Sequence, residues 1–216
     1  GWVTLTFVPQ IDVPADAWCD WDAVNQRFIT VGEKYPGGLT AKRKSVVYYP
    51  RDLYDVPLHD GSTLSIGDFV MKMILTFDRA DPASAIYDES TVPAHRSFMA
   101  HFRGVRIVSQ NPLVIETYSD LWHLDAEWNV DTWFPFYEGG PGFWHTLTLG
   151  IMAEAHGALA FSKAKADKFG RIWTNYVAGP SLNTLEFYLD IAAHVALVPY
   201  APTLGQYITV AEAAQR

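Results

Sequence analysis

The order of two hydrophobic periodicities is the feature that most constrains this chain. Strand-type alternation dominates the first part of the sequence, and helical spacing dominates the last third. The clearest strand signal is a hairpin at 105–118, where two β-branched runs flank the polar turn 109–112. Shorter strands are expected at 3–8, 27–31 and 45–49. Strands followed by helices predict an α+β fold with a mostly antiparallel sheet and packed helices.

Helical spacing predicts three main helices, over 64–80, 145–168 and 180–196. Ser65 and Asp68 have the spacing of a capping box at the start of the first. The helix over 180–196 has one apolar stripe, formed by Leu182, Leu185, Leu189, Ala192 and Ala196. A further helix opens at Thr209 close to the last position, which is expected either of a piece of a longer protein or of a short terminal helix.

Composition narrows the class of protein further. With 216 residues, 49% of them hydrophobic, the chain is long enough for a core without disulfides or metals, so we expect a single α+β domain over 1–216. Cys19 is the one cysteine, which excludes an intrachain disulfide and a cysteine-based zinc site. A net charge of −8 disfavours a nucleic-acid partner, and the basic cluster 42–44 is interpreted as the solvated end of a strand.

Candidate chemistry is sparse. Ser162 and Lys165 match the Ser-x-x-Lys pattern of penicillin-recognising enzymes, but the partner motifs are absent and Ser162 would lie late in the predicted helix. The seven histidines lack metal-ligand spacing, and the acidic loop around Trp18 lacks the glycine and glutamate of a calcium loop. We therefore expect no metal, no cofactor and no enzyme activity. A glycosidase-type pair stays open among Glu116, Asp125, Glu127 and Asp131, but nothing singles out two of them.

Residues 121–144 form an aromatic segment that holds eight Trp, Tyr and Phe side chains. Two interpretations remain open at this point. The segment is a core or a buried interface between lobes, or it is a wall against which a ligand packs. For the second interpretation, the candidate ligand-binding residues are Trp133, Phe134 and Tyr137.

Residues 56–70, VPLHDGSTLSIGDFV, resemble a signature of the extracellular solute-binding proteins, family 5, in which a helix follows a His-Asp-Gly turn. The hairpin at 105–118 resembles the next landmark of that family. Residues 175–181 and 200–209 resemble stretches of a prokaryotic subgroup, and the best-matched part is 56–118. Ser62-Thr63 departs from the usual turn of the signature.

The resemblance implies a fragment of a type II periplasmic-binding-protein-like receptor, the substrate-binding component of an ABC importer. Such a receptor captures a small solute, for example an oligopeptide, outside the cytoplasmic membrane of a prokaryote. Its partners are the permease and the remaining lobes of the same polypeptide. No ligand residue can be transferred, because the family's ligand-binding acidic residue lies in a part without a counterpart here. The alternatives are an aromatic-rich carbohydrate-binding or carbohydrate-cleaving module, and an intracellular interaction domain.

Overall fold

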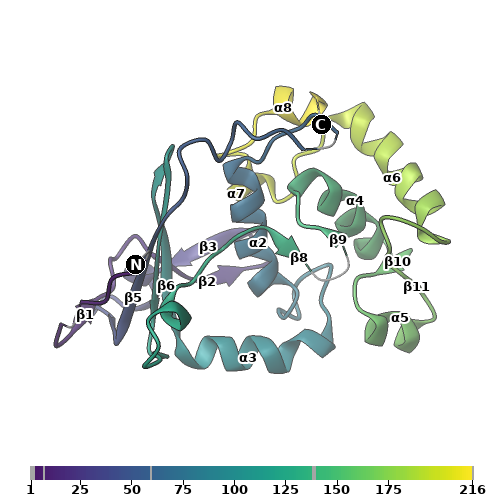
Figure 1. Ribbon diagram of the computed structural model, residues 1–216. Helices are drawn as coiled ribbons and strands as arrows, with labels where there is room; N and C mark the ends of the chain where they lie inside the picture. Colours follow the sequence, from purple (N-terminus) through teal and green to yellow (C-terminus); the bar gives the residue numbers. More distant parts are fainter. Residues whose placement is uncertain (1–2, 7, 59, 138–139, 216) are drawn as a thin grey trace. The chain divides into compact units, whose positions relative to one another are not determined.

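The computed structural model describes residues 3–6, 8–58, 60–137 and 140–215 (Figure 1). The chain divides into two compact units, each made of three segments. Unit 1 comprises Gly1–Trp21, Phe28–Thr63 and Ala94–Trp133, and unit 2 comprises Asp22–Arg27, Leu64–Pro93 and Phe134–Arg216. Helices and an antiparallel sheet are both present, which confirms the α+β class. That 1–216 is one domain stays a prediction.

Unit 1 is built on a five-stranded sheet (Figure 1). The predicted hairpin is confirmed, and its strands pair antiparallel, but the turn is shorter than the predicted 109–112. Ser109 and Gln110 pair with Val114 and Leu113, so that Asn111-Pro112 alone connects the two strands. The outer neighbours of the hairpin are also antiparallel to it. In spatial order the strands are β3 (Arg27–Thr30), β2 (Trp18–Asp22), β6 (Phe102–Gln110), β7 (Leu113–Ser119) and β5 (Arg43–Tyr48).

The strand predicted at 3–8 is wrong, because the described residues of that stretch, 3–6 and 8, have no strand structure. Alternation marks a chain that can form a strand, but a strand also needs a hydrogen-bonding neighbour. The first paired segment is instead β1 (Ile11–Asp12), which pairs antiparallel with β4 (Thr40–Ala41). One core cluster draws on β2, β4, β7, α1 (Val31–Lys34) and the segment after β1. Its members are Val13, Ala17, Cys19, Val31, Ala41 and Tyr118, and Ile11 of β1 packs against them.

Two further helical elements complete the description of unit 1. The helix α3 (Val92–His101) precedes β6, and its segment from Ala94 onward belongs to this unit. A short 3-10 helix, η2 (Glu127–Asn129), lies in the aromatic segment after β7. The side chain of Asn129 holds this turn, because it bonds the main chain of His123 and Asp125.

The segment Leu64–Pro93 of unit 2 begins with α2 (Ile66–Asp78), the helix predicted over 64–80. The predicted capping box is confirmed, and the Asp68 carboxylate accepts a hydrogen bond from the main-chain N–H of Ser65 at 2.7 Å. The other oxygen of Asp68 accepts the main-chain N–H of Trp144 at 2.8 Å. One carboxylate therefore caps α2 and ties it to the start of α4 (Trp144–Ala155).

The single helix predicted over 145–168 is wrong. The chain forms α4, then the short strand β10 (Leu159–Ala160), then α5 (Lys163–Phe169). The break lies at Gly157, whose φ of +76° is in the left-handed region that favours glycine and reverses the chain direction after a helix. Strand β10 pairs in parallel with β11 (Ile172–Trp173).

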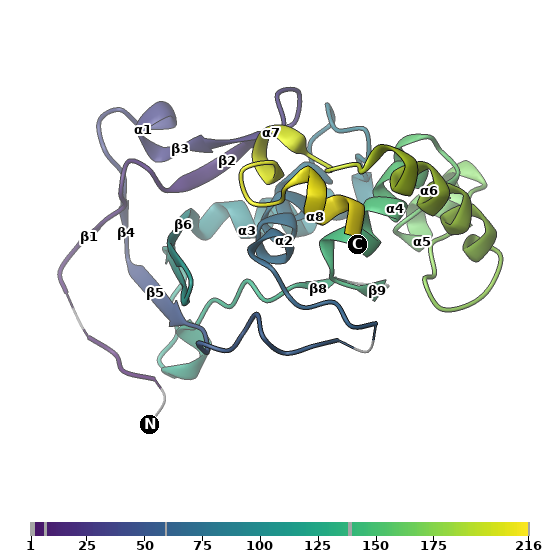
Figure 2. The ribbon, with the colours of Figure 1, turned by 90° about the horizontal axis from the view of Figure 1, so that it is seen from above.

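The helix predicted over 180–196 is confirmed as α6 (Ser181–Val195), which runs beside α4 (Figure 2). Its predicted stripe is partly wrong: Leu185 is buried, whereas Leu189 is 50% exposed and Tyr188 is buried in its place. The core of this region consists of Ala153, Leu159, Leu185 and Tyr188. The remaining elements are η1 (Glu89–Thr91), β8 (Phe136–Tyr137), β9 (Gly140–Pro141), α7 (Ala201–Leu204) and α8 (Val210–Gln215), the last of which agrees with the helix expected after Thr209.

Within the described ranges, no helix has the length and apolar character needed to cross a membrane.

Candidate functional site

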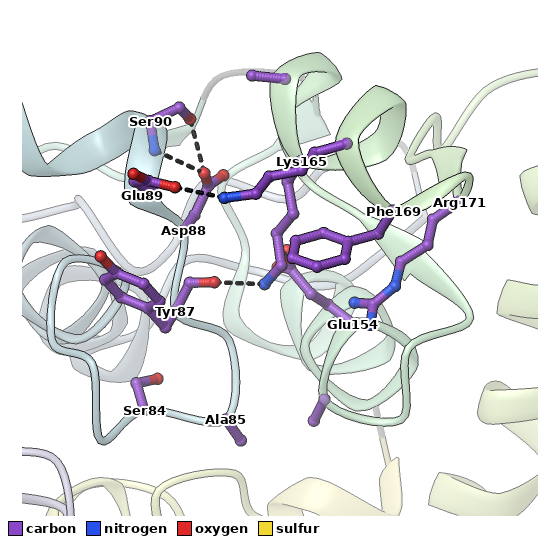
Figure 3. Close-up of a pocket in the computed structure, with 13 residues that line it drawn as sticks. Ser84, Ala85, Tyr87, Asp88, Glu89, Ser90, Glu154, Lys165, Phe169 and Arg171 are labelled. Carbon is purple, nitrogen blue, oxygen red and sulfur yellow. Dashed lines mark hydrogen bonds and ion pairs between the residues drawn. The ribbon is translucent and has the colours of Figure 1, made fainter.

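Unit 2 contains a pocket of about 380 Å³, shown in Figure 3. Its walls come from three places in the sequence: the loop 84–90, the end of α4, and α5 (Lys163–Phe169) together with Arg171. The volume lies in the range of sites that hold a small molecule. Charged side chains of both signs line it, so the electrostatics of the pocket decide what it can hold.

The loop 84–90 is held in place by hydrogen bonds to the end of α2. The buried carboxylate of Asp78 accepts a hydrogen bond from the hydroxyl of Ser84 at 2.7 Å and another from the hydroxyl of Tyr200 at 2.7 Å. The main-chain N–H of Asp88 donates to the carbonyl of Arg79 at 2.8 Å. This wall of the pocket is therefore ordered by buried polar contacts.

Asp88 forms one of the buried ion pairs of the site. Its Oδ2 lies 2.9 Å from Nη2 of Arg79, and its Oδ1 accepts the main-chain N–H and the hydroxyl of Ser90. Burial opposes ionisation, but hydrogen bonds from Ser162 and Ser90, together with the Arg79 charge, hold the pKa of Asp88 below its usual value. Asp88 is therefore a charged carboxylate whose two oxygens are both occupied.

Glu154 and Lys165 form a second buried pair, with the Lys165 ammonium 3.0 Å from Oε1 of Glu154. The same ammonium donates to the main-chain carbonyl of Tyr87 at 2.6 Å (Figure 3). The other oxygen of Glu154, Oε2, is buried and has no hydrogen-bond partner among the described residues. Burial raises the pKa of Glu154, and Lys165 opposes this shift only in part.

The structure corrects the position of Ser162. It does not lie late in a helix but is the N-cap of α5, where its hydroxyl accepts the main-chain N–H of Lys165 at 3.0 Å. The ammonium of Lys165 is nevertheless directed to Glu154 and Tyr87. Because its ammonium is engaged by these two partners, Lys165 is not placed to act as a base for the Ser162 hydroxyl.

The outer part of the pocket carries two more cations. Lys168 pairs with Glu89 at 2.5 Å, and both side chains are exposed. The guanidinium of Arg171 lies over the ring of Phe169, 5.1 Å from its centroid (Figure 3). Arg171 makes no ion pair with any residue that the structure describes, which sets it apart from the other cations of the pocket.

The predicted ligand-binding residues lie elsewhere. Trp133 is 6% exposed in unit 1, where its indole N–H donates to the hydroxyl of Thr117 at 2.9 Å. Phe134 belongs to unit 2, is 49% exposed and lies edge-on to Phe69. Tyr137 is in β8, and its side chain lies outside what the structure describes. None of the three lines the pocket of unit 2, and their role in ligand binding stays a prediction.

Three of the four candidate carboxylates near the aromatic segment make other contacts. Glu116 pairs with Lys44 at 2.5 Å, and Asp131 pairs with Arg43. The side chain of Asp125 accepts the main-chain N–H of Glu127 at 3.1 Å, as in a turn. The described residues also contain no group of three His, Cys, Asp or Glu side chains placed to hold a metal ion.

The sequence did not predict the pocket, although the Ser-x-x-Lys pattern included Lys165, which lines it, and Ser162, which caps α5. The residues that meet there are separated by some 70 positions, and only packing brings them together. Comparison with known proteins finds no matching family model and no matching curated protein.

Proposed function

We propose that this chain is part of the substrate-binding component of an ABC importer. That component captures a solute such as an oligopeptide outside the cytoplasmic membrane and delivers it to the permease. The observation that carries the proposal is the signature-like stretch 56–70, which leads into the capped helix α2. The hairpin of β6 and β7 then follows in the order expected from the resemblance.

The pocket of unit 2 supports binding rather than catalysis as the activity of this chain. Each carboxylate there has a cation beside it, and Lys165 is held by Glu154 and by the main chain. Side chains engaged in such pairs are not available as a free nucleophile or base. The proposal therefore includes no cofactor and no chemical step.

The first test is the size and place of the native product, by immunoblot of fractionated source cells. We expect an exported or membrane-associated band much heavier than the 24.2 kDa of this chain, because the receptor has further lobes. Purified full-length product should then bind oligopeptides in calorimetry. A band at 24.2 kDa that stays in the cytoplasmic fraction would contradict the proposal.

Variants of the full-length receptor test the aromatic segment. Phe134 is half exposed, so F134A should weaken peptide binding with little change in melting temperature if this ring faces ligand. W133A serves as the matched comparison, because Trp133 is buried and its loss should lower the melting temperature. Unchanged peptide affinity in F134A would remove Phe134 from the ligand wall.

One observation favours a second candidate, a carbohydrate-binding module. Trp122 is 53% exposed and Trp128 is 72% exposed, both in the aromatic segment of unit 1. Exposed indole faces are suited to stacking on sugar rings. Soluble oligosaccharides should then quench tryptophan fluorescence in the wild type and fail to do so in the W122A/W128A variant. No quenching in the wild type would exclude this candidate.

A further inference from the structure

The charges of the pocket in unit 2 balance except for one. The carboxylates of Asp88, Glu89 and Glu154 each have a cation of their own, which is Arg79, Lys168 and Lys165 respectively. Arg171 has no such carboxylate among the described residues. When Arg79 is counted, which pairs with Asp88 but does not line the pocket, the site carries a surplus of one positive charge, located on the planar guanidinium of Arg171.

That surplus favours an anionic ligand over a cationic one. A cation approaching the unpartnered Oε2 of Glu154 would also meet the ammonium of Lys165, 3.0 Å from Oε1 of the same carboxylate. Glu154 is 1% exposed, so its free oxygen offers almost no surface to a ligand. Arg171 lines the pocket and carries a fork of donors that matches a carboxylate.

The number of nearby carboxylates limits the charge of the ligand. Asp88, Glu89 and Glu154 all line the pocket, and each would repel a second negative charge on the ligand. Every negative charge of a ligand meets this repulsion, but a monoanion pairs with Arg171 and brings the net charge of the site to zero. A phosphate dianion or a dicarboxylate leaves the site with a net negative charge.

The remaining wall is apolar. Phe169 is 56% exposed, although Lys168 Nζ and the Arg171 guanidinium lie 5.6 Å and 5.1 Å from its ring centroid, and Ala85, Ala155 and Ala164 also line the pocket. The exposed part of the ring and the alanines offer contact area to an apolar ligand body. With about 380 Å³, the pocket has room for a body the size of one aromatic ring beyond the carboxylate.

We propose that the pocket of unit 2 binds a small organic monocarboxylate. Its carboxylate pairs with Arg171, and its apolar body lies against Phe169 and the neighbouring alanines. The site is additional to the importer role proposed above and does not depend on it. Its test uses neither a peptide nor the permease, so a failure of one proposal leaves the other standing.

Benzoate is the probe, titrated against residues 1–216 and followed by ligand-observed NMR and calorimetry. We expect saturable binding of benzoate, and binding at least about tenfold weaker for the neutral isostere benzamide, because it lacks the charge-assisted pair. Phthalate and inorganic phosphate should also bind more weakly, since each brings a second negative charge. Equal or tighter binding of benzamide or phosphate would overturn the ligand class, and no saturable binding of benzoate would overturn the site.

Arginine variants test whether benzoate binds at Arg171. R171Q should weaken benzoate at least about tenfold, and R171K should weaken it less, since lysine keeps the charge but loses the planar fork. R51Q is the matched control, because Arg51 is an exposed arginine of unit 1 outside the pocket, and its benzoate affinity should equal that of the wild type. The melting temperature of each variant confirms the fold. An R171Q variant that is folded and binds benzoate like the wild type would overturn the assignment.

Discussion

Two buried glutamates, one in each unit, have opposite pKa shifts. Glu116 of unit 1 is 7% exposed and Glu154 of unit 2 is 1% exposed, so burial alone favours the protonated form at both. Burial opposes ionisation of Glu116, but hydrogen bonds from Lys44 and Tyr118, with the charges of Lys44 and Arg106, hold its pKa below the usual value. Burial prevails at Glu154 and raises its pKa, although Lys165 lies beside it.

The difference lies in how many donors reach each oxygen. Oε1 of Glu116 meets Lys44 at 2.5 Å, and Oε2 accepts the hydroxyl of Tyr118 at 2.8 Å. Arg106 lies 3.4 Å from the same Oε2. At Glu154, both contacts go to Oε1, and Oε2 has none among the described residues. A buried carboxylate is thus stabilised as an ion only when both of its oxygens are served.

Removing the lysine from each pair is the strongest way to break this comparison. K165M leaves Glu154 buried without a cation and should lower the free energy of unfolding by about 3–5 kcal/mol. K44M should cost only about 1 kcal/mol, because Lys44 is partly exposed and Arg106 and Tyr118 remain at Glu116. Urea unfolding followed by circular dichroism measures both values at neutral pH.

The double variant E154Q/K165M is the control for that experiment. It removes both charges and should recover most of the stability that K165M loses. Equal losses in K165M and K44M would mean that the number of donors at each oxygen does not set the cost of burial here.

Two buried tryptophans extend the comparison to neutral groups. The indole N–H of Trp133 in unit 1 donates to Thr117 at 2.9 Å, whereas the indole N–H of Trp144 in unit 2 is buried without a hydrogen-bond partner in the described ranges. W133F and W144F remove similar volumes. W133F should cost about 1 kcal/mol more, because it also removes a hydrogen bond and leaves the Thr117 hydroxyl buried without it. A larger loss of unfolding free energy in W144F would contradict this expectation.

The pH dependence of stability should show the smallest effect and the clearest difference of sign. Because folding lowers the pKa of Glu116, its contribution is present above the unfolded pKa and is lost as the pH falls through the folded value. Folding raises the pKa of Glu154, so stability from this group falls as the pH rises from its unfolded value toward the folded one.

Between acidic and neutral pH, the stability gap between wild type and E116Q should therefore widen as the pH rises toward the unfolded glutamate pKa of about 4.3, and the gap between wild type and E154Q should narrow as the pH rises above it. Each change amounts to about 1.4 kcal/mol for every unit by which folding shifts the pKa. Urea midpoints across this pH range measure both gaps. Two gaps that move in the same direction would show that the two shifts do not have opposite signs.

The sequence predicted those elements that are set by residues a few positions apart. The capping box of Ser65 and Asp68 starts α2 as expected, and the β-branched runs around 109–112 form the hairpin of β6 and β7. The expectation failed where an Ala-rich pattern ran through Gly157, because a left-handed glycine ends a helix even within favourable composition. The prediction also failed in part at α6. The helical spacing of apolar residues does not fix which face of a helix is buried, and here Tyr188 packs into the core.

The sequence by itself therefore determined the α+β class, the capped helix, the hairpin and the absence of an intrachain disulfide. Only the tertiary structure decided which charges are paired, that Trp133 is buried while Phe134 is half exposed, and that Arg171 lines a pocket with no ion-pair partner among the described residues. The physical reason is distance along the chain. Caps and turns are made by residues a few positions apart, whereas Asp88 and Lys165 line one pocket only because two separate segments fold against each other.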